Sequence, residues 1–371
     1  MSDDSARIFD EFEKKGYTDG LPIIPPTEAR VAEMLEYTDR KPDDSLGRVP
    51  PAEYEATVKS VAVNAVMAGC KPEYFPVVVT EIEVLLSLPN LRASLATTGP
   101  CWPTSIVNGP IAREIGMYSG WGVLGTGPNH RANLTIGRTM TLVCQNIGKS
   151  KPGISEKKPC LNAGRYGICF AENEAASPWE PLHVEKGFAR DTSTVTGIAE
   201  GGRFEMLHGG RHSGIFAIDV RRFAESLNKV NVPNCNQVVE NAVTLIVFTP
   251  GQAKIYSENG WTKSDVKNFL YDNCKSEPPS KWYLDYPEDL RENILKTTFI
   301  HTPVWKRRDL NVGLPLFPSP ESIMIVVAGG EPPRITWKEP SHHGNDPAII
   351  KPIAFADGTP VKSVYDFQRK K

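Results

Sequence analysis

The residues best suited to chemistry gather in residues 95–147, where a cysteine in a proline-rich turn precedes a glycine-rich segment. Cys101 lies in the turn at residues 100–103 and carries a thiol, whose ionised form is a nucleophile and a redox group. Residues 120–128 contain too many glycines for a helix or a strand, so their backbone N–H groups are accessible to a ligand. These features together favour an active site in this stretch.

An anion-binding pocket is predicted beside this thiol. The glycine segment leads into a predicted helix over residues 132–147, and a glycine loop before a helix N-terminus suits a carboxylate or a phosphate. Neither GxGxxG after a strand nor GxxxxGK[ST] is present, so the segment is no nucleotide fingerprint. The predicted substrate-binding residues are Asn108, Gly125, Gly127, Asn129 and Arg131, the last able to fork two hydrogen bonds onto a carboxylate.

A blander interpretation of the same stretch stays open. Glycine and proline commonly do no more than make turns between packed elements. In that case Arg131 pairs internally with Glu114 or another carboxylate and fixes the loop, so that an added anion finds no vacancy.

A second group of reactive side chains follows a strand predicted at residues 166–170. Glu172 and Glu174 come at the end of that strand, and His183 and Glu185 lie in the proline-interrupted segment beyond it. Carboxylates with one imidazole hold divalent cations or transfer protons. We predict Glu172, Glu174 and His183 as catalytic groups with Cys101. The same three residues and Glu185 are the candidate metal ligands. The metal lacks a supporting HExxH spacing, and the sequence indicates no other cofactor.

The order of predicted strands and helices around these residues indicates an α/β protein in two subdomains. It has mixed or parallel sheets, packed helices and many ordered Gly/Pro loops. Strands are predicted near residues 94–98, 104–108, 166–170, 243–248 and 322–328, and helices near 55–69, 74–88 and 132–147. The expected divisions are an N-terminal arm and linker over 1–52, a central α/β unit with the site over 53–200, and a second α/β portion over 201–371 with a long Pro/aromatic excursion at 276–320.

Composition narrows the class of partner. The chain of 371 residues has 42 basic and 44 acidic side chains without long like-charge runs, which argues against nucleic acid or an anionic membrane as a partner. Its 7 cysteines show no CxxC or zinc-finger spacing, which fits reduced thiols in the cytoplasm. No segment approaches the roughly 18 apolar residues of a membrane span. We therefore expect a cytoplasmic homo- or hetero-oligomer that acts on a small molecule.

Seven stretches together resemble an uncharacterised bacterial family associated with the UGSC-motif selenoproteins. They are DGLPIIPPTEARVAEML, VAVNAVMAGCKPEYFPVVV, SIVNGPIAREIG, NHRANLTIGR, CFAENEAASPWEPLHVEKGF, GWTKSDVKNFLYD and SIMIVVAGG, and they span most of the chain. The resemblance implies that longer members add a domain in which selenocysteine or cysteine precedes Gly-Ser-Cys. This motif is absent here. The resemblance therefore implies a separate redox polypeptide as partner, and it implies no catalytic residue, since residues 100–103 fall where the family varies.

Three functions are consistent with these patterns. The first, which we favour, is an enzyme or enzyme subunit that acts on a small carboxylate-bearing or acyl substrate by thiol- or selenol-assisted bond cleavage or reduction. The second is a metal-dependent lyase or hydratase that uses the Glu/His group, with Cys101 only packing. The third is a non-catalytic partner subunit, which the polar groups in glycine loops disfavour because a scaffold needs an exposed apolar patch.

Overall fold

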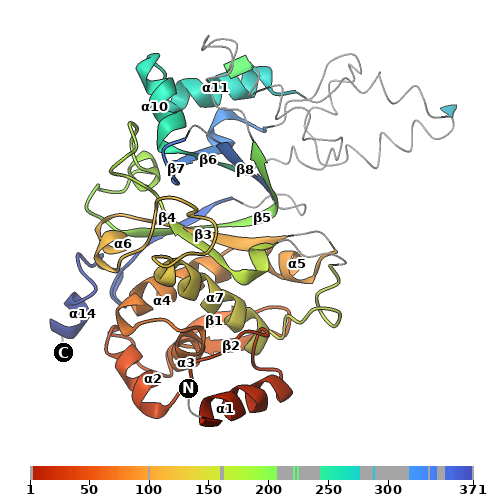
Figure 1. Ribbon diagram of the computed structural model, residues 1–371, viewed down its shortest axis with the longest axis vertical. Coiled ribbons are helices and arrows are strands. Elements are labelled where there is room, and N and C mark those ends of the chain that lie inside the picture. The colour runs from red at the N-terminus through yellow and green to blue at the C-terminus, as the bar shows by residue number, and fades with distance from the viewer. Residues whose placement is uncertain are drawn as a thin grey trace. The chain divides into compact units, whose positions relative to one another are not determined.

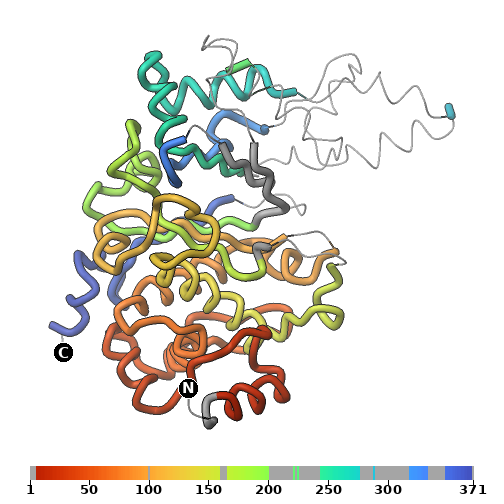
Figure 2. The backbone as a smooth tube through the Cα atoms, in the orientation of Figure 1, coloured from red at the N-terminus to blue at the C-terminus, as the bar shows by residue number. Residues whose placement is uncertain are grey.

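The computed structural model describes residues 3–98, 101–158, 163–206, 243–275, 317–332, 335–340 and 347–369, with residues 220, 221, 224, 287 and 288 in between. The chain forms two compact units. Unit 1 comprises Met1–Glu172, Pro181–Glu200 and Ala348–Lys371, and unit 2 comprises Asn173–Glu180 and Gly201–Pro347. Residues 1–52, expected as an arm, and residues 348–371, expected in the second portion, both belong to unit 1 (Figure 2). Most of the excursion at 276–320 lies outside the described residues.

Unit 1 begins with capped helices and a small hairpin. Helix α1 spans Asp3–Lys14 and α2 spans Glu28–Leu35, where the Thr27 side chain accepts a hydrogen bond from the backbone of the first turn. Strands β1 (Ser45–Val49) and β2 (Tyr54–Thr57) pair antiparallel. Helix α3 (Val58–Ala68) starts three residues later than the predicted helix over 55–69, because residues 54–57 are used by β2 and Thr57 caps α3.

Helices α4 and α7 confirm two predicted helices of unit 1. A 3-10 turn at Pro72–Tyr74 leads into α4 (Phe75–Leu86), and α7 spans Arg131–Asn146. The predicted strand at 94–98 is wrong, because Leu91–Ala96 forms helix α5. Its buried residues Leu91, Ser94 and Leu95 have helical spacing, which outweighs the β-branched Thr97 and Thr98 that follow.

The sheet of unit 1 is built around one fully buried strand. All seven residues of β3 (Trp102–Asn108) are buried, with parallel β4 (Ile168–Ala171) on one side and antiparallel β5 (Thr194–Met206) on the other. Strand β9 (Ile349–Pro352) pairs with the opposite edge of β5. Trp102 and Pro103, which we predicted in a turn, belong to β3. The remaining elements of the unit are α6 (Pro110–Glu114), η2 (Ala163–Tyr166), α8 (Leu182–Glu185) and α14 (Asp366–Arg369).

Helix α7 packs against the sheet of unit 1 (Figure 1). Two glycines, one in the helix and one just before β4, allow the two backbones to approach closely. A Cβ on Gly137 would lie 2.3 Å from the Gly167 carbonyl oxygen, and a Cβ on Gly167 would lie 1.9 Å from that of Gly137. Gly167 also has a φ of +83°, which L side chains rarely adopt. The backbone of α7 therefore rests directly on the chain that enters β4.

Unit 2 repeats the strand arrangement of unit 1. Strand β6 (Thr244–Phe248) pairs parallel with β7 (Ile323–Val327) and antiparallel with β8 (Ile335–Pro340). Helices α10 (Pro250–Glu258) and α11 (Lys263–Asn273) lie in sequence between the parallel strands, and a 3-10 turn at Pro320–Ser322 precedes β7. Thr262 and Asp265 form a capping box at the start of α11. In both units, a parallel pair is joined through helices and a third strand is antiparallel to the first strand of the pair.

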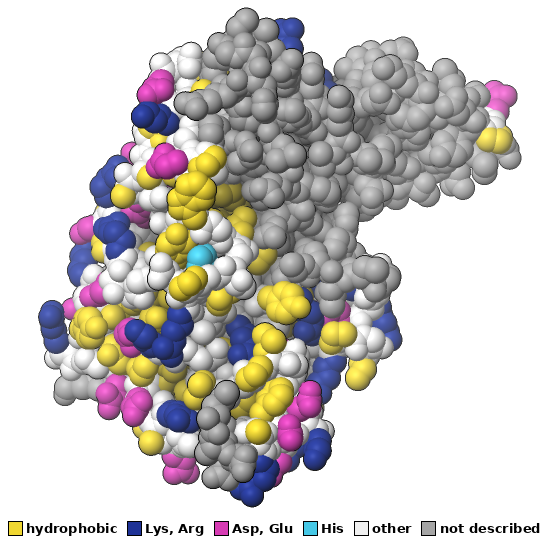
Figure 3. Space-filling view, viewed as in Figure 1, with side chains coloured by type: hydrophobic (Ala, Val, Ile, Leu, Met, Phe, Trp, Pro, Cys, Tyr) yellow, Lys and Arg dark blue, Asp and Glu magenta, His cyan; other side chains and the backbone are white. Residues whose placement is uncertain are grey.

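The predicted α/β class is thus confirmed, with mixed and parallel sheets and helices packed against strands. Among the described residues, no helix has the length and apolar character needed to cross a bilayer. On the face drawn in Figure 3, acidic and basic side chains are interspersed over the described surface.

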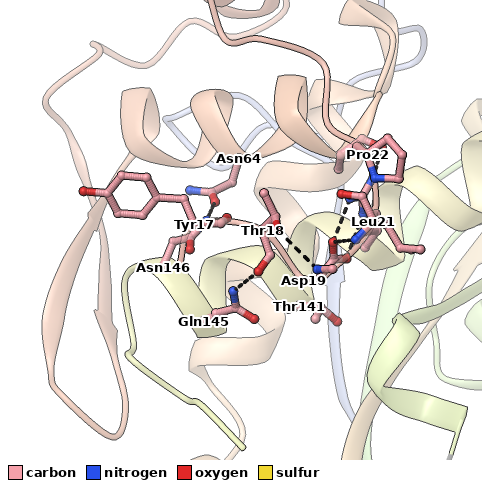
Figure 4. A network of polar contacts seen from close by, with 12 residues as sticks. Tyr17, Thr18, Asp19, Leu21, Pro22, Asn64, Thr141, Gln145 and Asn146 are labelled. Carbon is pink, nitrogen blue, oxygen red and sulfur yellow. Dashed lines mark hydrogen bonds and ion pairs between the residues drawn. The ribbon is translucent and has the colours of Figure 1, made fainter. Parts of the chain in front are cut away.

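The N-terminal segment of unit 1 is held onto α7 by polar side chains (Figure 4). Arg138 forks onto Asp19, with Nε and Nη2 donating to the two carboxylate oxygens at 2.8 and 2.7 Å. Gln145 donates to the carbonyl of Thr18, and Asn146 donates to that of Tyr17. Three residues on one helix therefore fix three consecutive residues of the segment.

Arg138→Lys is expected to lower the unfolding free energy of unit 1 by about 2 kcal/mol, because lysine keeps the charge but cannot make the planar fork in this partly enclosed pair. Chemical denaturation measures the change. Arg92→Lys is the control, since the Arg92–Glu53 pair is 62% and 40% exposed, and its expected effect is within about 0.5 kcal/mol. Equal effects in the two variants would contradict a special role for the fork.

Candidate functional site

The predicted catalytic residues lie at opposite ends of β3. Cys101 immediately precedes the strand and Asn108 is its last residue. Seven steps of about 3.3 Å place their α carbons about 23 Å apart. Glu172 is at the Asn108 end, where its Oε2 accepts a hydrogen bond of 2.7 Å from Asn108 Nδ2. The expected juxtaposition of Cys101 with Glu172 as its acid–base partner is therefore wrong.

Glu172 and His183 hold the loop in which they occur. Glu172 Oε2 also accepts a hydrogen bond of 2.8 Å from the backbone N–H of Leu182, at the start of α8. His183 is fully buried, and its Nε2 lies 3.3 Å from the carbonyl oxygen of Arg190. The Glu172 carboxylate thus joins the start of α8 to the last residue of β3. Both side chains thus contact backbone, and their catalytic role stays a prediction.

The predicted metal ligands are not assembled into a site. Glu174 belongs to unit 2, whereas Glu172, His183 and Glu185 belong to unit 1. Within the ranges that the structure describes, no three His, Cys, Asp or Glu side chains form a group able to hold a metal ion. The four residues therefore do not appear together as the ligand set that we expected.

The glycine segment turns back on itself. Val123 N donates to Gly120 O, and Gly125 N donates to Gly122 O at 2.7 Å. The imidazole of His130 fills the loop: it is 4% exposed, its Nε2 lies 3.1 Å from Gly122 O, and its ring centroid is 4.4 Å from that of Tyr118. Part of the backbone expected to face a ligand is thus used within the loop, next to a buried histidine that the sequence did not reveal.

Arg131 is directed toward helix α3. Its Nε and Nη2 donate to the carbonyl oxygen of Gly69 at 3.3 and 3.2 Å, where α3 ends. The alternative pairing with Glu114 is not formed, because the Glu114 carboxylate accepts from Ser363 Oγ and Val364 N. Asn129 is exposed beside it. The guanidinium fork therefore binds a carbonyl, and the pocket at Gly125, Gly127, Asn129 and Arg131 stays a prediction.

A different cluster lies at the start of β3, next to Cys101 in the sequence. Two cations lie over the ring of Trp102, the residue that follows it: Lys158 Nζ is 4.8 Å and Arg165 Cζ is 5.2 Å from the ring centroid. Glu156 lies between them, with Oε1 at 3.2 Å from Lys158 Nζ and Oε2 at 3.0 Å from Arg165 Nε. We call this group, together with Ser150, the Trp102 cluster.

Charge in the Trp102 cluster is enclosed and unbalanced. The Lys158 and Glu156 side chains are fully buried and that of Arg165 is 13% exposed, so two cations face one carboxylate. Burial lowers the pKa of Lys158, while the charges of Glu156 and Cys101 act in the opposite direction. Cys101 is thus near enough to Lys158 to interact with it electrostatically.

Two other thiols, on Cys70 and Cys144, are buried as Cys101 is. Burial raises the pKa of Cys144 to about 12 and that of Cys70 to about 11. Both therefore remain neutral at physiological pH, as inert buried cysteines do. None of the described cysteines forms a disulfide.

Four polar atoms of the Trp102 cluster lack hydrogen bonds within the described part of the chain: Ser150 Oγ, Trp102 Nε1, Glu156 Oε1 and Lys158 Nζ. The last two are in ion-pair contact without hydrogen-bond geometry. Buried polar atoms nearly always have a partner, in protein or in ordered water. These four atoms therefore have hydrogen-bonding capacity that the described chain does not use.

No protein-family model matches the chain, and no curated protein matches its sequence significantly. The function is therefore inferred from the geometry of the described residues.

Proposed function

We propose that the protein is an enzyme in which the Cys101 thiolate acts on a small carboxylate-bearing or acyl substrate. The observation that supports this proposal is that Cys101 directly precedes Trp102, whose ring contacts Lys158 in an enclosed cluster of two basic side chains and one carboxylate, and that Cys101 interacts electrostatically with Lys158. A neighbouring cation favours the thiolate, which is the reactive form of cysteine. The proposed reaction centre is thus at the amino end of β3.

For an acyl substrate, the Cys101 sulfur forms a bond to the acyl carbon. The bond to the leaving group breaks, and that group keeps the electron pair and takes a proton from the Lys158 ammonium. Water then attacks the thioester, the acyl group leaves as a carboxylic acid, and the released Cys101 thiol returns its proton to the Lys158 amine. Both residues end in their starting state, as nucleophilic catalysis requires.

The two alternatives receive less support. A metal-dependent lyase needs a ligand set, and the described candidates do not form one. For a reductive reaction, we propose that the second thiol or selenol comes from the separate UGSC-type polypeptide, as the family resemblance implies. A non-catalytic subunit would have no use for a charged cluster around a cysteine.

Alkylation tests the proposal. Native protein is treated with iodoacetamide between pH 6 and 9, and the labelled peptides are quantified by mass spectrometry. We expect Cys101 to react at least tenfold faster than Cys70 and Cys144 at pH 7, because their thiols are neutral there. Lys158→Met should slow labelling of Cys101 about tenfold. Lys157→Met is the matched control, because Lys157 Nζ is directed to the carbonyl of Gly153 instead.

An activity measurement completes this test. Short-chain thioesters and activated esters are offered to wild type and to Cys101→Ser, and the serine variant should lose at least 100-fold in kcat/KM. Cys101 that stays unlabelled in the folded protein, or labels equally fast in Lys158→Met, would contradict the proposal.

A further inference from the structure

The Trp102 cluster has more cationic than anionic groups, and this excess points to a ligand. We propose that Lys158 and Arg165 bind a small monoanionic carboxylate against Trp102, beside Cys101. The cluster then has a second function, the binding of an anion. The inference rests on the proposed function in one respect, which is that the carboxylate belongs to the substrate. This site is distinct from the anion pocket predicted at residues 120–131.

The cluster offers hydrogen-bond donors that its own residues do not use. Lys158 Nζ, Ser150 Oγ and Trp102 Nε1 are buried and make no hydrogen bond within the described chain. Arg165 directs Nε to Glu156 and Nη2 to the carbonyl of Ser150. Its Nη1 is in neither bond, and a planar guanidinium presents such N–H groups in a fixed fork that matches a carboxylate.

The side of entry follows from exposure. The side chains of Lys158 and Glu156 are fully buried, whereas 13% of the Arg165 side chain is exposed. Tyr166, the next residue, is 68% exposed. A carboxylate therefore approaches past Arg165 and ends at the enclosed Lys158.

Charge balance selects a monoanion. Glu156 neutralises one of the two cations, which leaves one buried positive charge that is costly without a counter-charge. A bound carboxylate supplies that counter-charge. A dianion such as phosphate would leave a buried negative charge, so it is disfavoured.

This balance means that the Cys101 thiolate and the carboxylate compete for Lys158. Removing the sulfur should therefore tighten carboxylate binding, and a bound carboxylate should slow alkylation of Cys101. A cluster that merely fills space shows neither effect.

The experiment measures binding of acetate and formate by thermal shift at constant ionic strength, with inorganic phosphate and chloride for comparison. Wild type, Cys101→Ala, Lys158→Met and Lys157→Met are compared. We expect saturable stabilisation by acetate with a Kd about tenfold lower in Cys101→Ala than in wild type. Lys158→Met should lose the saturable shift, and Lys157→Met should match wild type. Where Lys158→Met does not fold, protection of wild-type Cys101 from iodoacetamide by acetate replaces that comparison.

The outcomes separate this inference from the proposed function. Absence of a saturable acetate shift in Cys101→Ala, with alkylation of Cys101 still dependent on Lys158, overturns the carboxylate site and leaves the thiol enzyme standing. Tight acetate binding with an unreactive Cys101 supports the site and overturns the enzyme. Equal binding of phosphate and acetate contradicts the monoanion class.

Discussion

Gly167→Ala is expected to lower the unfolding free energy of unit 1 by about 4 kcal/mol. The added Cβ meets two separate penalties. A φ of +83° is strained for alanine, which costs about 1–2 kcal/mol. The Cβ would also lie 1.9 Å from the carbonyl oxygen of Gly137, so α7 must shift from β4, and overpacking of this kind costs about 1–3 kcal/mol. The thermal midpoint should fall by about 10 °C.

Gly187→Ala isolates the first penalty. Gly187 has a φ of +90° and nothing within 4 Å of the added Cβ. Its loss should therefore be limited to the strain of about 1–2 kcal/mol. A loss in Gly187→Ala as large as that in Gly167→Ala would show that the contact with α7 contributes nothing.

Gly137→Ala tests the same contact from the side of α7, where helix propensity by itself favours alanine. In an ordinary helix interior, glycine to alanine stabilises by about 1 kcal/mol. Here the Cβ would lie 2.3 Å from the Gly167 carbonyl oxygen, so we expect destabilisation instead. Chemical denaturation followed by circular dichroism decides the sign, and it does so even where Gly167→Ala fails to fold. Stabilisation would disprove the close approach of α7 to β4.

The buried strands and helices could be predicted from the sequence because their patterns are long and uniform. The runs at 243–248 and 322–328 are continuously apolar, and they form β6 and β7. The helices at 74–88 and 132–147 likewise contain buried faces at helical spacing. Such patterns record burial directly, since each apolar side chain must leave water.

Local turn signals were less informative. Pro100 and Pro103 favoured a turn around Cys101, yet Pro103 lies inside β3. Glycines were interpreted as open ligand-binding backbone, whereas Gly137 and Gly167 serve close packing and Gly125 serves an internal turn. Close packing of two backbones, a positive φ and a backbone that faces a ligand all favour glycine. The presence of a glycine in the sequence therefore does not show which of the three requirements it meets.

The Trp102 cluster could not be predicted because it joins distant parts of the chain. Cys101 and Trp102 come from the start of β3, whereas Glu156, Lys158 and Arg165 come from the connection that leads to β4. In the sequence these appear as an ordinary Lys/Pro/Gly linker. Only the parallel pairing of β3 with β4 brings the connection back to Cys101. Conversely, the sequence predicts Cys101 and Glu172 in one catalytic site, but the length of β3 places them at opposite ends of the strand.

Glu81 is expected to make unit 1 lose stability as the pH rises from about 5 to about 8. The side chain is fully buried on α4, and burial raises its pKa to about 8. The thiols near it, on Cys70, Cys144 and Cys169, have raised pKa values as well. The folded protein therefore holds Glu81 as a neutral acid.

The sign follows from proton binding. Between the ordinary pKa of 4.5 and about 8, Glu81 is protonated in the folded state and ionised in the unfolded state. The folded state binds more protons, so stability falls with rising pH, by at most about 1.4 kcal/mol per pH unit. The fall ends above pH 8, where the folded state ionises too.

Glu81→Gln removes this dependence, because glutamine keeps the shape and stays neutral in both states. Compared with wild type, the variant should be about equally stable at pH 5 and more stable by a few kcal/mol at pH 8, as measured by urea denaturation at both values. Glu83→Gln, on the same helix but partly exposed and paired with Arg40, should lose stability by a similar small amount at both pH values. A difference between Glu81→Gln and wild type that stays constant from pH 5 to pH 8 would mean that Glu81 is ionised in the folded protein, and that the core of unit 1 contains a counter-charge for it.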